Sequence, residues 1–278
     1  MDTLKKLFRR KITLVGAVVL GIVAIMAIFS PFLTPYNPYE MNMQDRLQSP
    51  NLSHFFGTDN FGRDIFSRVM YGAQLSLLSG FSSVVFASVF GVLLGILAGY
   101  FERLEGIIMR LVDVFMAFPP LLLALILMSI MGRGLLNVVM AVGVAYLTRI
   151  ARVTFGLTLK IKEDPYIEAA RAMGANNARI LFKHVLPNLI SPIIVQASFT
   201  FAFSLLQIAA LDFLGLGLPP EIPSWGGMLN QGRTYITRAP WLLVFPGIFI
   251  VITVLSFNLL GDALRDELDP RFQEEVTA

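Results

Sequence analysis

Residues 69–101 read VMYGAQLSLLSGFSSVVFASVFGVLLGILAGYF and contain no charged side chain. An α-helix rises 1.5 Å per residue, so about 20 apolar residues cross a bilayer core roughly 30 Å thick. This stretch is longer than one crossing needs, and we expect its first residues to belong to the loop before it. The stretch predicts a membrane-spanning helix, with lipid as its solvent.

Further apolar segments follow the same rule, and together they set the fold class. Candidate spans lie at residues 12–39, 111–132, 135–148, 184–211 and 239–261. We expect the first to end near Pro31, and Asp113 interrupts the second near one end. The segment 135–148 is too short to cross unless it takes in flanking residues. The prediction is an all-α polytopic membrane protein with about six transmembrane helices.

The composition is typical of a lipid-facing protein. Apolar residues make up 55% of the chain and charged residues 15%, whereas an ordinary soluble domain has about 25% charged residues. The net charge of +3 could indicate nucleic-acid binding, but basic residues that flank apolar blocks are better explained by membrane orientation. We therefore expect no nucleic-acid partner. The chain has no cysteine, which excludes disulfides, thiolate metal sites and cysteine nucleophiles.

Basic residues near the N-terminus indicate the orientation of the chain. Lys5, Lys6, Arg9, Arg10 and Lys11 precede an apolar segment that is longer than a signal-peptide core and lacks a small-x-small cleavage site. We therefore expect an uncleaved first helix that starts in the cytoplasm. This orientation leaves six of the 22 Lys and Arg residues outside, namely Arg46, Arg63, Arg68, Arg133, Arg233 and Arg238. Six crossings then place both termini in the cytoplasm.

The predicted topology divides the chain into two parts. Residues 1–72 would hold an N-terminal cytoplasmic tail, the first transmembrane helix and an outer loop. Residues 73–278 would form a five-helix core with a cytoplasmic loop at about 154–190. Trp225 and Trp241 are predicted to anchor the protein at the membrane interface, because their rings are amphipathic.

Small residues recur within the long apolar stretch. Gly91, Gly95 and Gly99 are spaced four residues apart and form a smooth helix face, for which we favour tight helix packing over a direct role at a pore. No span carries a chain of ionisable groups, because Asp113 and Asp212 lie near span ends. This pattern argues against a proton-coupled carrier, so we expect the energy source to lie outside this chain.

The inner loop predicts a short helix that begins and ends at clear signals. Residues 160–188 read KIKEDPYIEAARAMGANNARILFKHVLPN. Asp164 is a good N-cap, and Pro165 follows at the first helical position, where a missing N–H costs nothing. Gly174 ends this helix, because glycine readily adopts the left-handed conformation of a C-terminal cap.

A second short helix follows in the same loop. Either Asn176 or Asn177 can cap its start. Pro187 would stop it and could begin the next span. The loop is therefore predicted to contain two helices joined near Gly174.

The first loop helix has a small and adaptable surface. Ala169, Ala172 and Met173 fall at positions i, i+3 and i+4, so they share one face. Such a face suits the close approach of a partner protein. It fits equally well a helix that lies at the lipid headgroup boundary, and the spacing leaves both interpretations open.

The inner loop also carries a spaced motif. Its members are Glu168, Ala169, Ala170, Gly174, Leu186 and Pro187. Their spacing resembles the EAA signature of bacterial ABC importer permeases. That resemblance implies that these residues, together with Met173, contact ATP-binding subunits. His184 stands where the family usually has Ile, and a His before a branched apolar residue and Leu-Pro looks like the peptide-importer branch.

A second motif lies just before the long apolar stretch. Its residues, in the pattern G-T-D-x-x-G-R-D, are Gly57, Thr58, Asp59, Gly62, Arg63 and Asp64. The pattern resembles a segment of dipeptide, oligopeptide and nickel permeases, and residues 213–226 and 257–271 are similar to their second outer loop and closing segment. The glycines permit tight turns and the charges can pair. We expect docking of a binding protein or gating, with a self-paired, ordered loop as the open alternative.

The resemblance implies a function and a set of partners. The chain is expected to be the second, C-type permease subunit of a dipeptide, oligopeptide or nickel importer in the bacterial plasma (inner) membrane, with type I ABC importer permease architecture. It would form half of a translocation pore as a heterodimer with a related permease. ATP-binding subunits would bind ATP and Mg, and an extracytoplasmic binding protein would supply the substrate.

Nothing in the sequence predicts catalysis by the chain itself. No Lys follows a Gly, so the phosphate-binding G-K-[ST] step is absent. His54 and His184 are predicted on opposite sides of the membrane, which argues against a metal site or a His-dependent triad built from both. We expect no enzyme activity, catalytic residue, metal or cofactor in this chain. A nickel-chelate permease, an ATP-independent carrier or channel, and a structural scaffold are the alternatives.

Overall fold

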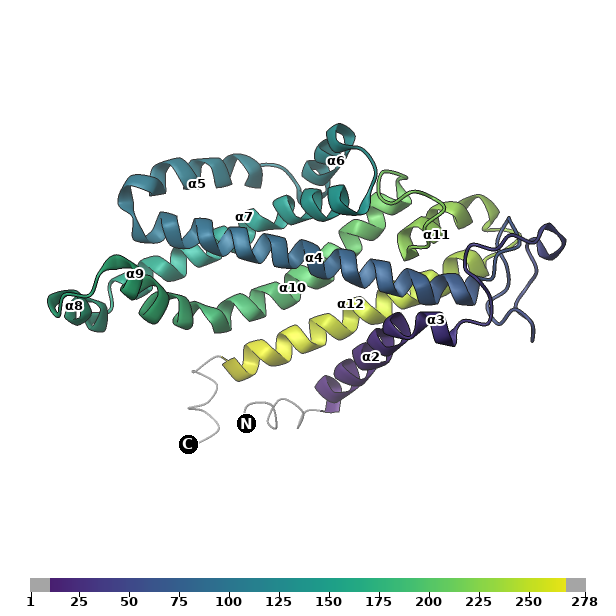
Figure 1. Ribbon diagram of the computed structural model, residues 1–278, viewed down its shortest axis with the longest axis horizontal. Coiled ribbons are helices and arrows are strands. Elements are labelled where there is room, and N and C mark those ends of the chain that lie inside the picture. Colours follow the sequence, from purple (N-terminus) through teal and green to yellow (C-terminus); the bar gives the residue numbers. More distant parts are fainter. Residues whose placement is uncertain (1–10, 269–278) are drawn as a thin grey trace.

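The computed structural model describes residues 11–268, and the regular elements in this range are helices (Figure 1). The long helices are α2 (Lys11–Ile28), α4 (Ile65–Tyr100), α5 (Glu102–Met116), α6 (Pro120–Met131), α7 (Leu135–Lys162), α10 (Leu186–Phe213) and α12 (Trp241–Leu268). The short ones are α3 (Ser30–Leu33), α8 (Pro165–Ala172), α9 (Asn177–Ile180) and α11 (Trp225–Gly232), with 3₁₀ turns at Met43–Asp45 and Arg233–Tyr235. The predicted all-α class is confirmed.

Two predicted features fall partly outside this range. Residues 1–10, which hold most of the basic residues used to orient the chain, lie outside the described residues. Residues 269–271, the end of the predicted closing segment, do so as well.

The predicted spans all correspond to helices, but not all are single straight ones. Within the described residues, four helices are long and apolar enough to cross a membrane, namely α4, α7, α12 and the continuous helix Asn177–Phe213. The pair α5 and α6 could form a further, bent span, and the apolar part of α2, Thr13–Ile28, is a shorter helix. The prediction of about six spans therefore corresponds to four full-length helices, one bent pair and one short helix.

The predicted span 111–132 is not one helix. α5 and α6 meet at an angle of 93°, at a break that ends with Pro119, and Pro120 is the first residue of α6. Proline lacks an N–H and restricts the residue before it, so this pair of prolines ends one helix and starts another.

Two helices extend beyond the apolar segments that predicted them. α4 begins at Ile65 rather than after residue 69, since the Asp64 carboxylate caps it by accepting from the Ser67 amide at 2.7 Å. α7 continues to Lys162, past the predicted span 135–148 and into the residues predicted as the inner loop, 154–190. Arg152 in this extension forms an ion pair with Asp113 of α5.

Pro187 does not stop a helix. It lies in the first turn of α10, directly after a π-helical turn at Leu181–Val185 that joins α9 to α10. A π turn inserts an extra residue into the helix, which can accommodate a position that has no N–H to donate.

The small residues of α4 lie against α7. Gly91, Gly95 and Gly99 are buried, and a β-carbon added at Gly95 would lie 2.5 Å from the β-carbon of Thr154 and 2.6 Å from the carbonyl oxygen of Ala151. The two backbones approach closely along this line, which is the geometry expected of a small-residue packing face.

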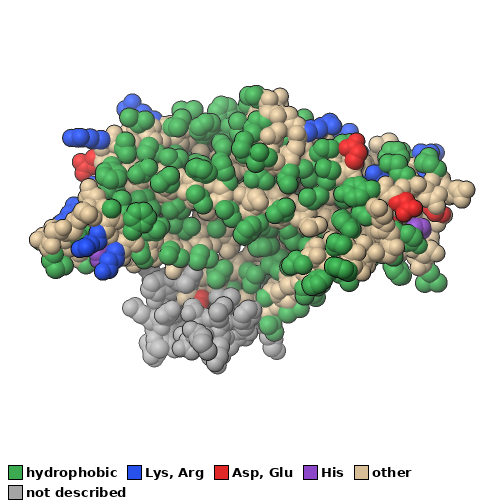
Figure 2. Space-filling view, in the orientation of Figure 1, with side chains coloured by type: hydrophobic (Ala, Val, Ile, Leu, Met, Phe, Trp, Pro, Cys, Tyr) green, Lys and Arg blue, Asp and Glu red, His purple; other side chains and the backbone are tan. Residues whose placement is uncertain are grey.

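The helices run between two ends of the bundle. The outer loop, residues 34–64, and α11 lie at one end, here called the loop end (Figure 1). The hairpin of α8 and α9 lies at the opposite end, here called the hairpin end, where α4 ends and α10 begins (Figure 1). Hydrophobic side chains cover the broad middle of the visible face, whereas charged side chains gather mainly toward its ends and upper edge (Figure 2).

Candidate functional sites

The hairpin of α8 and α9 is held on the bundle by two buried side chains. Ile167 from α8 and Ile180 from α9 are fully buried. They belong to one apolar cluster with Tyr100 of α4, Val185 of the π turn and Leu189 of α10. The hairpin therefore packs on the ends of spanning helices as a fixed body.

Local signals in the sequence shape this hairpin largely as predicted. Asp164 occupies the N-cap position and Pro165 the first turn of α8, although the Asp164 side chain makes no capping hydrogen bond. Gly174 has a φ of +84°, which ends the helix without the strain that a side chain would add. Asn176 caps α9 by accepting from the Arg179 amide at 2.9 Å.

The EAA-like residues are mostly exposed at the end of the molecule. Glu168, Ala169, Met173 and Gly174 are exposed, with Met173 at 83%, whereas Ala170 is buried beneath them. The exposed Met173 side chain leaves an adaptable apolar contact uncovered at this end of the molecule.

The predicted pair Leu186 and Pro187 lies beside α8 rather than on the hairpin itself. The side-chain amide of Asn188, the next residue, donates to the Tyr166 hydroxyl at 3.1 Å and to the His184 carbonyl at 2.7 Å. Partial desolvation, together with the Asp164 carboxylate, raises the pKa of Tyr166 above its ordinary value. The start of α8 is thereby fastened to the start of α10.

Tyr100 supplies a further link that sequence reasoning missed. Its hydroxyl donates to the side-chain carbonyl of Asn177 at 2.9 Å, and the Arg171 guanidinium lies 5.6 Å from the centre of its ring. The residue ends α4, so both contacts join the hairpin to that helix. Tyrosines are common at the ends of spanning helices, so no specific signal for this contact could be recognised beforehand.

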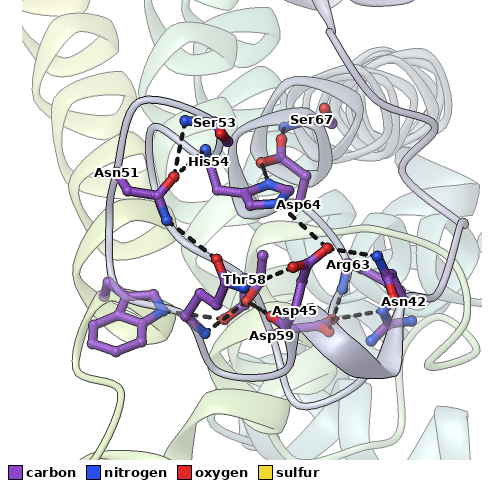
Figure 3. Close-up of polar contacts among 12 residues, drawn as sticks. Asn42, Asp45, Asn51, Ser53, His54, Thr58, Asp59, Arg63, Asp64 and Ser67 are labelled. Carbon is purple, nitrogen blue, oxygen red and sulfur yellow. Dashed lines mark hydrogen bonds and ion pairs between the residues drawn. The ribbon is translucent and has the colours of Figure 1, made fainter.

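The outer motif forms a buried polar network at the loop end (Figure 3). Arg63 donates from Nε to the Asp59 carboxylate at 2.6 Å, and the same carboxylate accepts from the backbone amides of Phe61 and Arg63. Asp64 caps α4 and lies 2.9 Å from the imidazole Nδ1 of His54. The structure therefore brings together the charged residues that the motif predicted, and adds His54 to them.

All six residues of the outer motif are buried. Thr58, Asp59, Arg63 and Asp64 are each at most 3% exposed. Gly57 and Gly62 have φ values of +75° and +72°, as tight turns require. Arg63 pairs with Asp59, whereas Asp64 bonds to His54 and to the Ser67 amide, so contacts within the loop and with the start of α4 hold these side chains in place. Docking and gating therefore stay predictions, and the surface that could meet a partner belongs to other residues of the loop.

The second outer loop is organised around one carboxylate. Asp212, at the end of α10, accepts from the Leu218 amide at 2.8 Å and from the Ser224 hydroxyl at 2.7 Å. Next to Ser224, Trp225 is 1% exposed, and its indole donates to the Val69 carbonyl at 3.0 Å. The prediction that Trp225 anchors the membrane interface is wrong, because its ring fills the protein core and fixes α11 to α4.

The described residues contain no group of three or more His, Cys, Asp or Glu side chains placed to hold a metal ion. His54 lies in the loop at one end and His184 in the π turn at the other (Figure 1).

Comparison with protein families gives two matches. Residues 91–274 match the family described as binding-protein-dependent transport system inner membrane component. Residues 1–50 match the N-terminal transmembrane domain of oligopeptide transport permease C.

Several curated proteins are similar over nearly the whole chain. A dipeptide transport system permease protein of Alkalihalophilus pseudofirmus is 43% identical, covering 98% of this chain and 90% of that protein. A glutathione transport system permease protein of Pectobacterium atrosepticum is 46% identical, covering 93% of this chain and 86% of that protein. A di/tripeptide permease protein of Pseudomonas aeruginosa is 42% identical over 93% of this chain and 88% of its own length.

The fold also resembles a solved structure. A chain of the MetNI methionine ABC transporter, in an inward-facing conformation, superimposes with a TM-score of 0.60 and 21% sequence identity. The match covers 73% of this chain and 97% of that one. At this identity the likeness concerns the fold alone.

Proposed function

The chain belongs to the family of binding-protein-dependent transport system inner membrane components, and from this we propose that it forms half of a pore that imports short peptides. It is a permease subunit of the ABC importer class and a multi-pass protein of the inner membrane. The other half of the pore would come from a related permease, as a heterodimer. Family membership removes the ATP-independent carrier from the alternatives.

Peptides are the substrate class that the relatives favour. The similar proteins are named for dipeptides, di- or tripeptides and glutathione, which is itself a small peptide. We extend this class to the present chain because the similarity covers at least 93% of it in each case.

The exposed hairpin is the observation that supports coupling between this chain and ATP-binding subunits. Glu168, Ala169, Met173 and Gly174 leave a contact surface uncovered at the end of the bundle, while Ile167 and Ile180 fix the hairpin below. A partner that grips this surface moves the ends of α4 and α10 with it. ATP and Mg would be bound by that partner, and this chain would need no cofactor.

Nucleotide can drive the pore only by a difference in affinity. The ATP-binding subunits must bind the hairpin in one pore conformation more tightly than in another, because equal binding shifts no population. A rigid link between hairpin and helices satisfies this requirement, since a loose hairpin would absorb the movement.

We assign the hairpin end to the cytoplasm and the loop end to the outside. Basic residues gather at the hairpin end, among them Lys160, Lys162 and Lys183, in keeping with the positive-inside rule. α2 begins and α12 ends toward this same side (Figure 1). Both termini are then cytoplasmic.

An extracytoplasmic binding protein would dock at the loop end. The buried motif around Asp59 and Arg63 would set the shape of the loop, while the exposed apolar side chains Leu52, at 93%, and Phe55, at 55%, would make the contact. This arrangement separates the residues that shape the docking surface from those that touch the partner.

Co-purification tests the coupling step directly. Ala169→Arg places a long charged side chain on the exposed hairpin surface, and Thr237→Arg makes the same change at the exposed loop end. We expect an ATP-binding subunit to co-purify with the wild type and with Thr237→Arg, but to be lost from Ala169→Arg. Equal recovery with both variants, or no ATP-binding subunit with the wild type, would contradict the proposal.

A further inference from the structure

A polar cavity of about 410 Å³ lies at the loop end, apart from the hairpin. Its walls come from the outer loop near Arg63, from the segment at Pro220 and Glu221, and from the region of α11 and the turn at Arg233–Tyr235. Pockets that take small molecules typically measure about 300–1,000 Å³. The cavity is therefore large enough for a small ligand.

A chain of hydrogen bonds ties the three walls together. Arg63 donates from Nη2 to the side-chain carbonyl of Gln231 at 2.8 Å, and the Gln231 amide donates to the Pro220 carbonyl at 2.7 Å. On its other side, Arg63 is held by Asp59 through Nε at 2.6 Å. The position of each wall is thus set before any ligand arrives.

The cavity retains hydrogen-bond donors that the described part of the chain does not use. A guanidinium has five N–H donors, and Nη1 of Arg63 makes no hydrogen bond to any described residue although its side chain is only 3% exposed. Arg233 also lines the cavity, with its guanidinium 5.9 Å from the centre of the Phe213 ring and no carboxylate partner among the described residues. Two guanidinium groups can therefore meet an anion there.

The same cavity carries one acidic side chain. Glu221 is exposed to it and forms no ion pair within residues 11–268. Phe61 and Tyr235 add aromatic surface to the lining. A ligand that has a carboxylate, an ammonium group and little bulk between them matches this set of groups.

We propose that this cavity binds a short peptide with free termini, with its carboxylate held by Arg63 and Arg233 and its ammonium group by Glu221. The inference rests on the proposed function for the substrate class, and it adds a binding site on the permease itself. The site would hold a peptide at the outer mouth before the peptide enters the pore.

Binding without the extracytoplasmic protein tests this site. The assembled importer, purified without its binding protein, is titrated with dialanine, with dialanine C-terminal amide and with N-acetyl-dialanine. The variants are Arg233→Gln and Glu221→Gln, with Arg238→Gln as the matched control, since Arg238 is an exposed arginine at the same end that does not line the cavity. ATP-driven dialanine uptake into proteoliposomes, with binding protein present, is measured in parallel.

We expect dialanine to bind the wild type and Arg238→Gln alike, and Arg233→Gln to bind it roughly tenfold more weakly, because a charge-assisted hydrogen bond is lost. Dialanine C-terminal amide has no carboxylate, so it should bind the wild type weakly, and Arg233→Gln should reduce its affinity little further. The acetylated peptide should show the same pattern with Glu221→Gln.

Absence of dialanine binding, or equal affinities for Arg233→Gln and Arg238→Gln, overturns the inference. If uptake is normal in that case, the proposed function stands and only the site falls. If Arg233→Gln weakens the binding protein's attachment but leaves dialanine affinity unchanged, the cavity receives an acidic side chain of that protein and the inference also falls. If the wild type takes up no dialanine, the proposed function is contradicted. The titration then still shows whether the cavity binds the peptide.

Discussion

The hydroxyl of Tyr100 donates a hydrogen bond of 2.9 Å to the side-chain carbonyl of Asn177. Tyr100 is the last residue of α4 and Asn177 is the first residue of α9, so this bond joins a long spanning helix to the exposed hairpin. α4 begins at the loop end, directly after Asp64 (Figure 1). A movement of the hairpin can thus be transmitted along one helix to the opposite end of the molecule.

Tyr100→Phe should weaken this transmission without detaching the partner. The substitution keeps the ring beneath Arg171 and removes only the hydroxyl, at a cost of about 0.5–1.5 kcal/mol for one hydrogen bond. We expect the ATP-binding subunit to co-purify as before, while peptide-stimulated ATP hydrolysis falls a few-fold. Tyr71→Phe is the control, because Tyr71 lies on the same helix and its hydroxyl makes no hydrogen bond within the described residues. Equal stimulation in the two variants would show that the bond carries no coupling.

The buried pair of Asp59 and Arg63 should be a major source of stability for the outer loop. Asp59→Asn leaves the Arg63 guanidinium buried without its carboxylate, and breaking one side of a buried ion pair costs about 3–5 kcal/mol. We expect a clear drop in the thermal unfolding midpoint of the detergent-solubilised protein. Glu40→Gln, at an exposed position in the same loop, should leave the midpoint almost unchanged. A small effect of Asp59→Asn would mean that water reaches Arg63.

The contact between α4 and α7 should tolerate no added side chain at Gly95. Gly95→Ala would place its β-carbon 2.5 Å from that of Thr154, so the helices must separate, and overpacking of this kind costs about 1–3 kcal/mol. Gly156→Ala on α7 is the matched control, because no atom of the part of the chain that the structure describes lies within 4 Å of the β-carbon that it adds. Thermal unfolding of both variants should show destabilisation only for Gly95→Ala. A stable Gly95→Ala protein would indicate that the helices slide apart at little cost.

The spans and their order were predictable because hydrophobic length is a local property of the sequence. Residues 69–101 have no other stable location than lipid or protein interior, and the glycine spacing within them identified the face that meets α7. Boundaries were less predictable, since they depend on single polar groups. The helix α4 starts at Ile65 because Asp64 caps it. Hydropathy averaged over many residues does not detect a single capping side chain.

The two motifs were recognisable in the sequence, but which of their residues are buried could not be predicted from it. Spacing indicated that Asp59, Arg63 and Asp64 could pair; the structure pairs Arg63 with Asp59, whereas Asp64 bonds to His54. Whether such a pair is buried depends on residues far away in sequence. Gln231, which accepts a hydrogen bond from Arg63, is one of them, and it cannot be recognised from the residues around the motif. Trp225 is buried for the same reason, because Val69 supplies the acceptor for its indole.

The bend between α5 and α6 should depend on Gln207. Its side-chain amide, buried in α10, donates to the Pro120 carbonyl at 2.9 Å and so fixes the first residue of α6. Gln207→Leu removes this donor while filling a similar volume, at a cost of about 1 kcal/mol for the lost hydrogen bond. The 93° angle between the two helices should then vary more widely.

Spin labels at Ile107 in α5 and Ile130 in α6, which are 72% and 77% exposed, report that angle as a distance distribution. We expect a broader distribution for Gln207→Leu than for the wild type. Gln196→Leu serves as the control, because within residues 11–268 the Gln196 amide bonds only to Thr200 of its own helix, at 3.3 Å. An unchanged distribution in Gln207→Leu would mean that Pro119 and Pro120 fix the bend alone, since their restricted backbone would then suffice without a contact from α10.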